Sequence, residues 1–345
     1  MSATDASARS GVTRPRRRPG IDTTGTSPGA SAANRSRRRR TARQYLTVAS
    51  FMWPALLGIA IFLLFPLGTA LNSSLHRFGI LDAPGTWYGL GNYRFLLHDP
   101  FVRTAAWNTL WFVVVMVPAQ ILTGLGSAML LTKFRGGSSF YRTVFYLPAL
   151  IPTVAGVLAF VYVLKPGVGP VDTLLGKFGI DGPLWFNSPS WSKPSLVLLS
   201  MWGIGNTMVI FLASLLDVPV SLYEAAAIDG ANAWRRFRHV TLPCISPVLL
   251  FTAITGIIAT LSFFTEAAVA AAAASGQATV GGGASGTFGY PQESTLTYPL
   301  YLYQAGFPQN LLGYANALAI VLFLVTLVVI AILLRRSRAF TEGAS

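Results

Sequence analysis

Cysteine, histidine and charged residues are scarce in this chain of 345 residues. Cys244 is the single cysteine, so no disulfide can form within the chain and no cage of thiolates can hold a metal. The three histidines lie far apart, and none has the spacing of a metal-ligand motif. Charged residues make up 11% of the sequence, against about 25% in soluble domains, whereas 52% is hydrophobic. This balance predicts a membrane protein without a metal site.

The sequence also lacks the short motifs of common enzyme classes. It contains no His-Glu-x-x-His zinc motif, no Gly-x-Ser-x-Gly nucleophile elbow and no paired carboxylates. It has no Gly-x-x-x-x-Gly-Lys-Ser/Thr loop, the device that cradles the phosphates of ATP. We therefore predict no catalytic residue and no cofactor bound by this chain, which argues against a membrane-embedded enzyme. Any ATP hydrolysis on which the chain depends must take place on a separate polypeptide.

Long apolar runs are the main feature that the sequence does have. A bilayer core about 30 Å thick requires about 20 mostly apolar residues from a spanning helix. We predict six such segments, at residues 49–71, 104–131, 142–164, 194–215, 247–268 and 310–334. Prolines within the runs, Pro118, Pro148 and Pro152, are expected to kink helices and to free backbone carbonyls. The predicted fold class is an all-α polytopic membrane protein with six transmembrane helices.

Basic residues indicate how these segments are oriented. The formal net charge is +14, and 11 of the 26 lysines and arginines lie in residues 1–43. Basic connections are retained on the cytoplasmic side during insertion. Placing both termini in the cytoplasm puts 20 basic residues on the inner side and leaves six on the outer side, namely Arg77, Arg94, Arg103, Lys165, Lys177 and Lys193. We therefore predict cytoplasmic N- and C-termini.

We expect four regions along the chain. Residues 1–43 form a basic tail with too few large apolar residues to fold. This tail is either solvated or attracted to anionic lipid head groups, and its lack of aromatic side chains argues against nucleic acid as a partner. Residues 44–103 hold the first span and an outer loop, residues 104–335 hold the other spans, and residues 336–345 form a short cytoplasmic tail.

The connection of residues 216–246, between the fourth and fifth spans, has strong local signals. Ser221 and Glu224 have the spacing of a capping box, which predicts the start of a short helix. Gly230 suits a left-handed helix end, and Asn232 is a good cap for a second helix. In that second helix the apolar residues Ala233, Phe237 and Val240 fall on one face and the basic residues Arg235, Arg238 and His239 on another. Such a helix either lies on the inner leaflet or docks onto a cytoplasmic protein.

A family resemblance bears on this choice. The string EAAAIDGANAWRRFRHVTLP resembles the EAA signature of binding-protein-dependent ABC importer permeases, in which Glu-Ala-Ala is followed by a Gly and later by Leu-Pro. The matching positions are Glu224, Ala225, Ala226, Asp229, Gly230, Leu242 and Pro243. Other stretches agree in the same order, among them GLGNYRFLLHDP and LGYANALAIVLFL. The resemblance covers residues from about 49 to 335 and is greatest to carbohydrate-type permeases similar to the maltose and glycerol-3-phosphate subunits.

The resemblance implies the ABC transmembrane type-1 fold in a bacterial inner membrane, with residues 216–246 seating a coupling helix in a cleft of a cytoplasmic ATPase. It further implies a second, similar permease, two ATPase subunits that bind ATP and Mg, an extracytoplasmic solute-binding protein and surrounding membrane lipid as partners. The implied substrate is a sugar, an oligosaccharide or a related polyol. The alternatives are an ABC importer for a non-sugar solute such as glycerol 3-phosphate, and an ion-coupled secondary transporter, which needs ionisable groups at mid-membrane.

Few strongly polar residues fall within the predicted spans. Asn108, Gln120 and Asn206 supply amides, and Glu266 is the only acidic residue near a span. Polar groups in a membrane often line a solute path, but amides also bond helices to one another, so both roles stay open. The stretch 267–289 is rich in Ala and Gly and predicts no stable element, at a place where the family usually has Gly-Gly-Pro.

Overall fold

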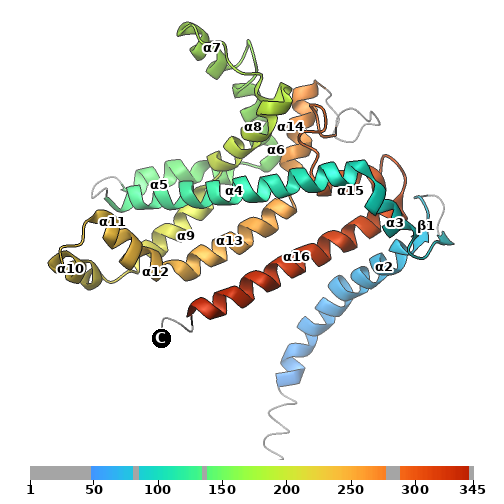
Figure 1. Ribbon diagram of the computed structural model, residues 1–345, viewed down its shortest axis with the longest axis horizontal. Coiled ribbons are helices and arrows are strands. Elements are labelled where there is room, and N and C mark those ends of the chain that lie inside the picture. The colour runs from blue at the N-terminus through green and yellow to red at the C-terminus, as the bar shows by residue number, and fades with distance from the viewer. Residues whose placement is uncertain (1–47, 81–84, 134–137, 277–287, 342–345) are drawn as a thin grey trace, which may run out of the picture. The chain divides into compact units, whose positions relative to one another are not determined.

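A computed structural model describes residues 48–80, 85–133, 138–276 and 288–341 of the chain (Figure 1). The predicted basic tail and the glycine run of the Ala/Gly-rich stretch lie outside these residues. The pattern of contacts divides the chain into two compact units, Met1–Phe65 and Pro66–Ser345.

The first predicted span is a helix, Val48–Ser74. It includes a π-helical stretch, η1 (Ala60–Leu64), which continues into α2 (Phe65–Ser74). Its 27 residues cover about 40 Å, enough to cross a hydrocarbon core about 30 Å thick. Large apolar side chains such as Phe51 and Phe62 are exposed along it, as expected for a helix surrounded by lipid.

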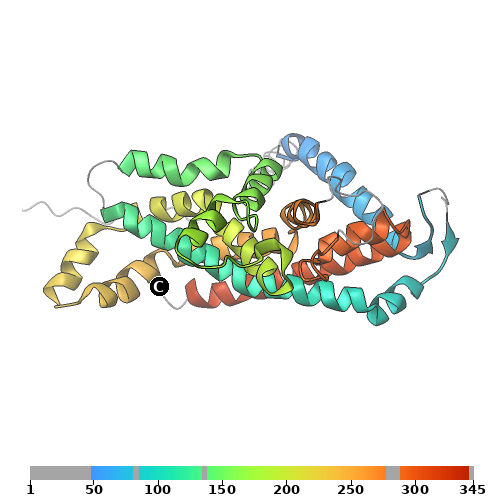
Figure 2. The ribbon, with the colours of Figure 1, turned by 90° about the horizontal axis from the view of Figure 1, so that it is seen from above.

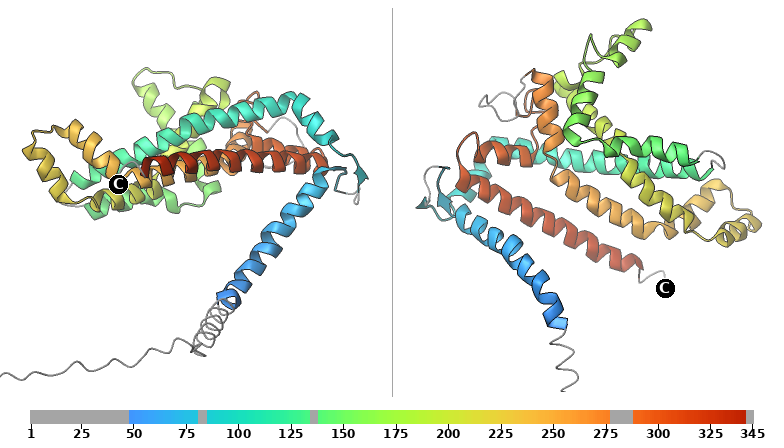
Figure 3. Two further views of the ribbon diagram at one scale, coloured as in Figure 1. Left: turned by 60° about the horizontal axis from the view of Figure 1, so that its bottom comes forward. Right: turned by 180° about the vertical axis from the view of Figure 1, so that it is seen from behind.

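The second unit is built around α4 (Pro100–Lys133), a helix of 34 residues that is about 51 Å long. It packs against α8 (Pro189–Trp202), α9 (Gly205–Leu216) and α13 (Ser246–Leu261). α16 (Leu312–Thr341) lies along α13 (Figure 1 and Figure 3). Both α4 and the part of α16 up to Arg335 are long and apolar enough to span a membrane. The predicted helices at 104–131 and 310–334 are therefore confirmed, and Pro118 lies within α4 without ending it.

The predicted spans 142–164 and 194–215 are bent pairs of helices, and a third bent pair joins the loop before it to the span predicted at 247–268. The pair formed by α5 (Ser138–Tyr146) with η2 (Leu147–Leu150) and by α6 (Thr153–Val163) bends by 102°. α8 meets α9 at 50°, and the helical stretch Ala233–Cys244 meets α13 at 69°. A kink within 142–164 was expected from its prolines and is confirmed, whereas the break within 194–215 was not expected. Pro152 adopts an extended backbone before α6, and Gly203 separates α8 from α9, so neither run continues as one helix.

The Ala-rich stretch after α13 forms a helix, α14 (Thr265–Ser275), contrary to the expectation of no stable element. The predicted span 247–268 is therefore interrupted after Leu261 and resumes as α14, which Figure 2 shows nearly end-on. Ala267 and Ala270 are buried, and α14 packs against α6. Small side chains allow two helix backbones to approach closely. The small alanine side chains, which give no clear helix pattern in the sequence, therefore permit the close packing of α14 against α6.

Short elements complete the second unit. They are β1 (His76–Arg77), paired antiparallel with β2 (Thr86–Trp87), α3 (Gly91–His98), α7 (Pro170–Lys177), η3 (Trp185–Asn187), α10 (Val220–Ile228), α11 (Ala233–Arg236), η4 (Phe237–Thr241), α12 (Leu242–Cys244) and α15 (Tyr298–Gly306). Asp99, just before α4, accepts hydrogen bonds from the hydroxyls of Tyr301 and Tyr314 and, at 2.9 Å, from the amide of Phe101. This carboxylate ties the start of α4 to α15 and α16.

Candidate functional sites

The loop between α9 and α13 folds as two helical arms joined by a tight turn. The first arm, α10, ends in a Schellman motif: the Ala231 amide donates to the Ala226 carbonyl at 2.9 Å, and the Gly230 amide donates to the Ala227 carbonyl at 3.1 Å. Gly230 has φ of 71°, a left-handed conformation that costs other residues about 1–2 kcal/mol. The predicted glycine turn is confirmed.

The two arms begin differently. Asn232 caps the second arm as predicted, because its side-chain oxygen accepts a hydrogen bond from the Arg235 amide at 2.9 Å. The predicted capping box of Ser221 and Glu224 is wrong. Pro219 holds the N-cap position with an extended backbone, so α10 begins directly after it and Ser221 already lies inside the helix. The second arm also runs one residue beyond the expected Pro243 and includes a π-helical stretch, η4.

The loop rests on a small apolar core at the ends of α4 and α9. Leu131, Phe211 and Ile245 are among its buried members, and Tyr223 and Phe237 from the loop pack against it. The Tyr223 and Thr241 hydroxyls lie 2.9 Å apart and link the two arms. Of the apolar face predicted for the second arm, Phe237 and Val240 pack against this core, whereas Ala233 is exposed. This packing fixes the loop to the ends of the long helices.

The tip of the loop is a solvent-exposed surface. Glu224, Ala225, Asp229 and Gly230 are exposed, and the Ile228 side chain, between them, is 88% exposed. The basic side chains of the second arm, Arg235, Arg238 and His239, are exposed as well.

The second half of the motif lies apart from this tip. Leu242 is half-buried and Pro243 is exposed in α12, where the arm meets α13. Ala226, in α10, is half-buried. The motif therefore supplies both the exposed tip and the joint to the next span.

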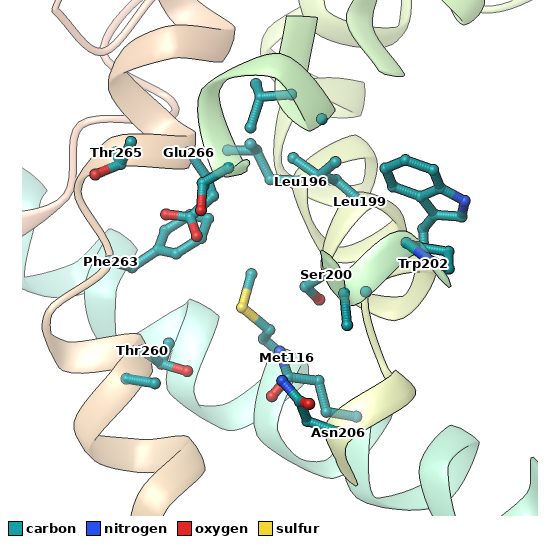
Figure 4. Close-up of a pocket in the computed structure, with 18 of the residues that line it drawn as sticks. Met116, Leu196, Leu199, Ser200, Trp202, Asn206, Thr260, Phe263, Thr265 and Glu266 are labelled. Carbon is teal, nitrogen blue, oxygen red and sulfur yellow. The ribbon is translucent and has the colours of Figure 1, made fainter. Parts of the chain in front are cut away.

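A cavity of about 540 Å³ lies between α4, α6, α8, α9, α13 and α14 (Figure 4). Rings, amides, hydroxyls and one carboxylate contribute to its lining, which includes Met116, Gln120, Ser200, Trp202, Asn206, Thr260, Phe263, Thr265 and Glu266. Binding pockets for small molecules have volumes of about 300–1,000 Å³ and combine apolar surface with a few polar groups. The cavity is therefore of a size and composition suited to a small polar solute.

The cavity coincides with the breaks in the bent helices. Ile151 and Thr153 come from the break between η2 and α6, Gly203 from that between α8 and α9, and Ser262 and Phe263 from that between α13 and α14. Within a membrane, non-helical backbone is tolerated where it is buried in protein or lines a water-filled space. The breaks therefore lie where the cavity can accommodate non-helical backbone.

Three of the predicted pathway residues line this cavity. Gln120 comes from α4, Asn206 from the first turn of α9 and Glu266 from the first turn of α14. The fold thus brings together side chains that lie up to 146 positions apart in the sequence. Figure 4 shows Asn206 and Glu266 on opposite sides of the open space.

Asn108 does not belong to this cavity. Its side-chain amide is buried and donates to the backbone carbonyls of Glu293 at 2.8 Å and Leu296 at 3.0 Å. Both carbonyls precede α15 and lie outside any helix. The Glu293 carbonyl also accepts from the Leu296 amide at 3.1 Å, whereas the Leu296 carbonyl relies on Asn108. The prediction of a pathway role for Asn108 is wrong, and its amide holds a loop against α4.

Several residues that line the cavity could not be predicted from the sequence. Trp202 and Phe263 were indistinguishable from other apolar residues of a span, and Ser200 and Thr260 from ordinary small polar ones. The one available signal is position: Trp202 directly precedes Gly203, and Phe263 follows Ser262 within the break before α14. Within the described residues, no group of three or more His, Cys, Asp or Glu side chains is placed to hold a metal.

Comparison with known proteins identifies the class to which this fold and these sites belong. The family described as binding-protein-dependent transport system inner membrane component matches residues 120–339, and the chain belongs to this family. It is 34% identical over 324 residues to the arabinooligosaccharides transport system permease protein AraP of Bacillus subtilis. The aligned residues cover 91% of this chain and 96% of AraP. It is 35% identical over 278 residues to the lactose transport system permease protein LacF of Rhizobium radiobacter, covering 78% of this chain and 87% of LacF.

A solved structure shows the same fold. A chain of a bacterial alginate ABC transporter, in complex with an alginate pentasaccharide-bound periplasmic protein, superposes with a TM-score of 0.72 at 21% sequence identity, covering 88% of this chain and 98% of that one. The chain is therefore a permease subunit of an ABC importer with the ABC transmembrane type-1 fold, a multi-pass inner-membrane protein. It is the membrane component and not the subunit that hydrolyses ATP.

Proposed function

We propose that this subunit forms half of the translocation pathway for a sugar or related solute, and that residues 216–246 couple this pathway to a separate ATPase. The observation that carries the proposal is the connection between loop and cavity. α9 starts beside the cavity at Asn206 and ends at the loop after Leu216. α13 starts at the loop with Ser246 and reaches the cavity at Thr260.

These two helices connect the loop to the cavity. α9 has 12 residues and α13 has 16, which gives lengths of about 18 Å and 24 Å. Because Tyr223 and Phe237 pack the loop onto the core below it, a partner that pulls on the loop also pulls on both helices. The breaks at Gly203 and Ser262 lie at the cavity ends of these helices, where the backbone can absorb a change of angle.

The chemistry of the cavity supports a carbohydrate as cargo. Side-chain amides and hydroxyls such as those of Gln120, Asn206 and Ser200 both donate and accept hydrogen bonds, as sugar hydroxyls do. Trp202 and Phe263 add flat apolar surfaces for the faces of sugar rings. Relatives named for arabinooligosaccharides and for lactose agree with this class. A carrier of glycerol 3-phosphate is the second candidate, since relatives are also named for that solute.

The exposed tip of the loop supports docking on an ATPase. In this proposal Glu224, Ala225, Ala226, Asp229 and Gly230 meet a cytoplasmic ATPase, while Leu242 and Pro243 join the arm to α13. Two such ATPase subunits bind ATP and Mg, a second permease completes the pathway, and an extracytoplasmic protein delivers the solute.

The structure also supports the proposed orientation. The loop, the Lys133 end of α4 and the C-terminal end of α16 lie at the same end of the second unit (Figure 1). This arrangement agrees with the distribution of basic residues, which favours that end in the cytoplasm. The basic residues of 1–43 favour the cytoplasm for the N-terminus as well.

Reconstitution tests the proposal. Proteoliposomes containing this subunit with its companion permease, ATPase and binding protein should take up labelled lactose or arabinooligosaccharides only when ATP is present. Glycerol 3-phosphate in the same assay tests the second candidate. ATP-independent uptake driven by an ion gradient, without ATPase subunits, would contradict the proposal and favour an ion-coupled transporter.

A further inference from the structure

The cavity contains an acidic side chain with an unusual setting. Glu266 is half-buried in the first turn of α14, where the helix N-terminus favours a negative charge. Among the described residues, no side chain forms an ion pair or a hydrogen bond with its carboxylate. Figure 4 shows the Glu266 side chain at the open space of the cavity. A carboxylate held in a solute path without a protein partner is available to the solute.

The rest of the cavity lining does not balance this charge. Of the described residues that line the cavity, Glu266 is the one that ionises, and the others are apolar or neutral polar residues. Lys165 lies just after the end of α6, but it lines a separate cavity of about 270 Å³ with Asn187 and Ala273. A solute in the larger cavity therefore meets one negative charge and no lining cation.

We propose that Glu266 makes the cavity selective for uncharged polyhydroxylated solutes over anionic ones. A carboxylate has two oxygens that accept hydrogen bonds, so it can receive both protons of a pair of neighbouring hydroxyl groups. The same group repels a phosphate, a sulfonate or a sugar acid, which find no cation in the lining to offset the repulsion. The inference rests on the proposed function and narrows its substrate class to neutral sugars and polyols.

The size of the expected effect follows from the repulsion between two charges. At an effective dielectric constant of about 20 to 40, two like charges about 7 Å apart change an affinity by roughly 7- to 55-fold. The binding protein imposes its own selectivity in any uptake assay. That contribution is the same for every permease variant, so it cancels when the neutral-to-acid uptake ratio of a variant is divided by that of the wild type.

The experiment measures uptake by the reconstituted full transporter. Lactose and arabinobiose serve as neutral probes, and their aldonic acids, lactobionate and arabinobionate, as anionic ones. We expect Glu266→Gln to lower the ratio of neutral to acid uptake by about 7-fold or more, and Glu266→Asp, which keeps the charge, to retain most of it. Glu293→Gln is the matched control, because it removes the same charge from the loop before α15, outside the cavity, and should leave the ratio unchanged.

The outcomes separate this inference from the proposed function. An unchanged ratio in Glu266→Gln, or an equal change in Glu293→Gln, overturns the selectivity role of Glu266 while leaving sugar import intact. If Glu266→Gln does not reach the membrane, Glu266→Asp is the deciding variant. A neutral-to-acid uptake ratio far below that of the wild type would contradict a role for the charge itself. Absence of ATP-dependent uptake of every sugar by the wild-type transporter refutes the proposed function instead.

Discussion

Replacement of Gly230 tests the backbone conformation of the loop turn without disturbing the packing of side chains around it. Gly230 has φ of 71°, and a Cβ added there meets no described atom within 4 Å. Gly230→Ala therefore introduces no clash within this chain, and its cost comes from the backbone alone. A non-glycine residue in the left-handed region costs about 1–2 kcal/mol, and a free-energy change of this size alters a population by a factor of about 5–30.

We expect this cost to appear in coupling rather than in the amount of folded protein. The loop remains attached to the core through Tyr223 and Phe237, so the change favours an opened turn without unfolding the helices. Solute uptake per ATP hydrolysed, measured in proteoliposomes, should fall about 5- to 30-fold, in line with the lower population of the bent loop. The level of the subunit in the membrane should stay close to that of the wild type.

Gly179 provides a matched control at the end of α7. It too has φ of 71° with no described atom within 4 Å of an added Cβ. It also ends its helix in a Schellman motif, with the Ile180 amide donating to the Leu175 carbonyl at 3.0 Å. Gly179→Ala has the same backbone cost but lies far from the loop of residues 216–246. Unchanged uptake per ATP in Gly230→Ala, or an equal loss in Gly179→Ala, would refute the reasoning.

Three further substitutions test other parts of the structure. Asn206→Leu removes hydrogen-bonding groups from the cavity and should raise the KM of uptake about 5- to 10-fold, equivalent to one hydrogen bond; an unaltered KM would remove Asn206 from the solute path. Asn108→Leu leaves the Leu296 carbonyl without its donor and removes one of the two bonds to the Glu293 carbonyl, so thermal unfolding of the purified subunit should show a loss of about 1–3 kcal/mol with little change in KM. Asp99→Asn weakens the charged hydrogen bonds at the start of α4 and should also lower the melting temperature, and an equally stable variant would show that this tie contributes little.

The features that could be predicted from the sequence are those set by local chemistry. α4 and α16 follow from long apolar runs, because only a helix satisfies its backbone within a bilayer. Gly230 and Asn232 follow from backbone preferences that hold in any fold. Ser221 shows the limit of such rules, since Pro219 starts the helix earlier than the capping pattern implies.

The remaining features depend on residues that are distant in the sequence. Asn108 and Asn206 are the same residue type in similar apolar surroundings, yet one satisfies two loop carbonyls and the other faces a cavity. Only the packing of α15 and α9 against α4 decides between these roles. The bend between α8 and α9 is equally hidden, because Gly203 and its neighbours do not lower the apolar character of the run enough to indicate a break. Composition predicts that a segment lies in the membrane, but not how it is divided there.

The 69° bend between the second arm of the loop and α13 has a practical consequence. Cys244 is exposed at the end of α12, directly before this bend, and it is the single thiol of the chain. A fluorophore or spin label attached to the unaltered protein therefore reports from the junction between the second arm of the loop and α13. Spectra recorded with and without nucleotide can then follow the angle of this junction during turnover, without removal of other cysteines from this subunit.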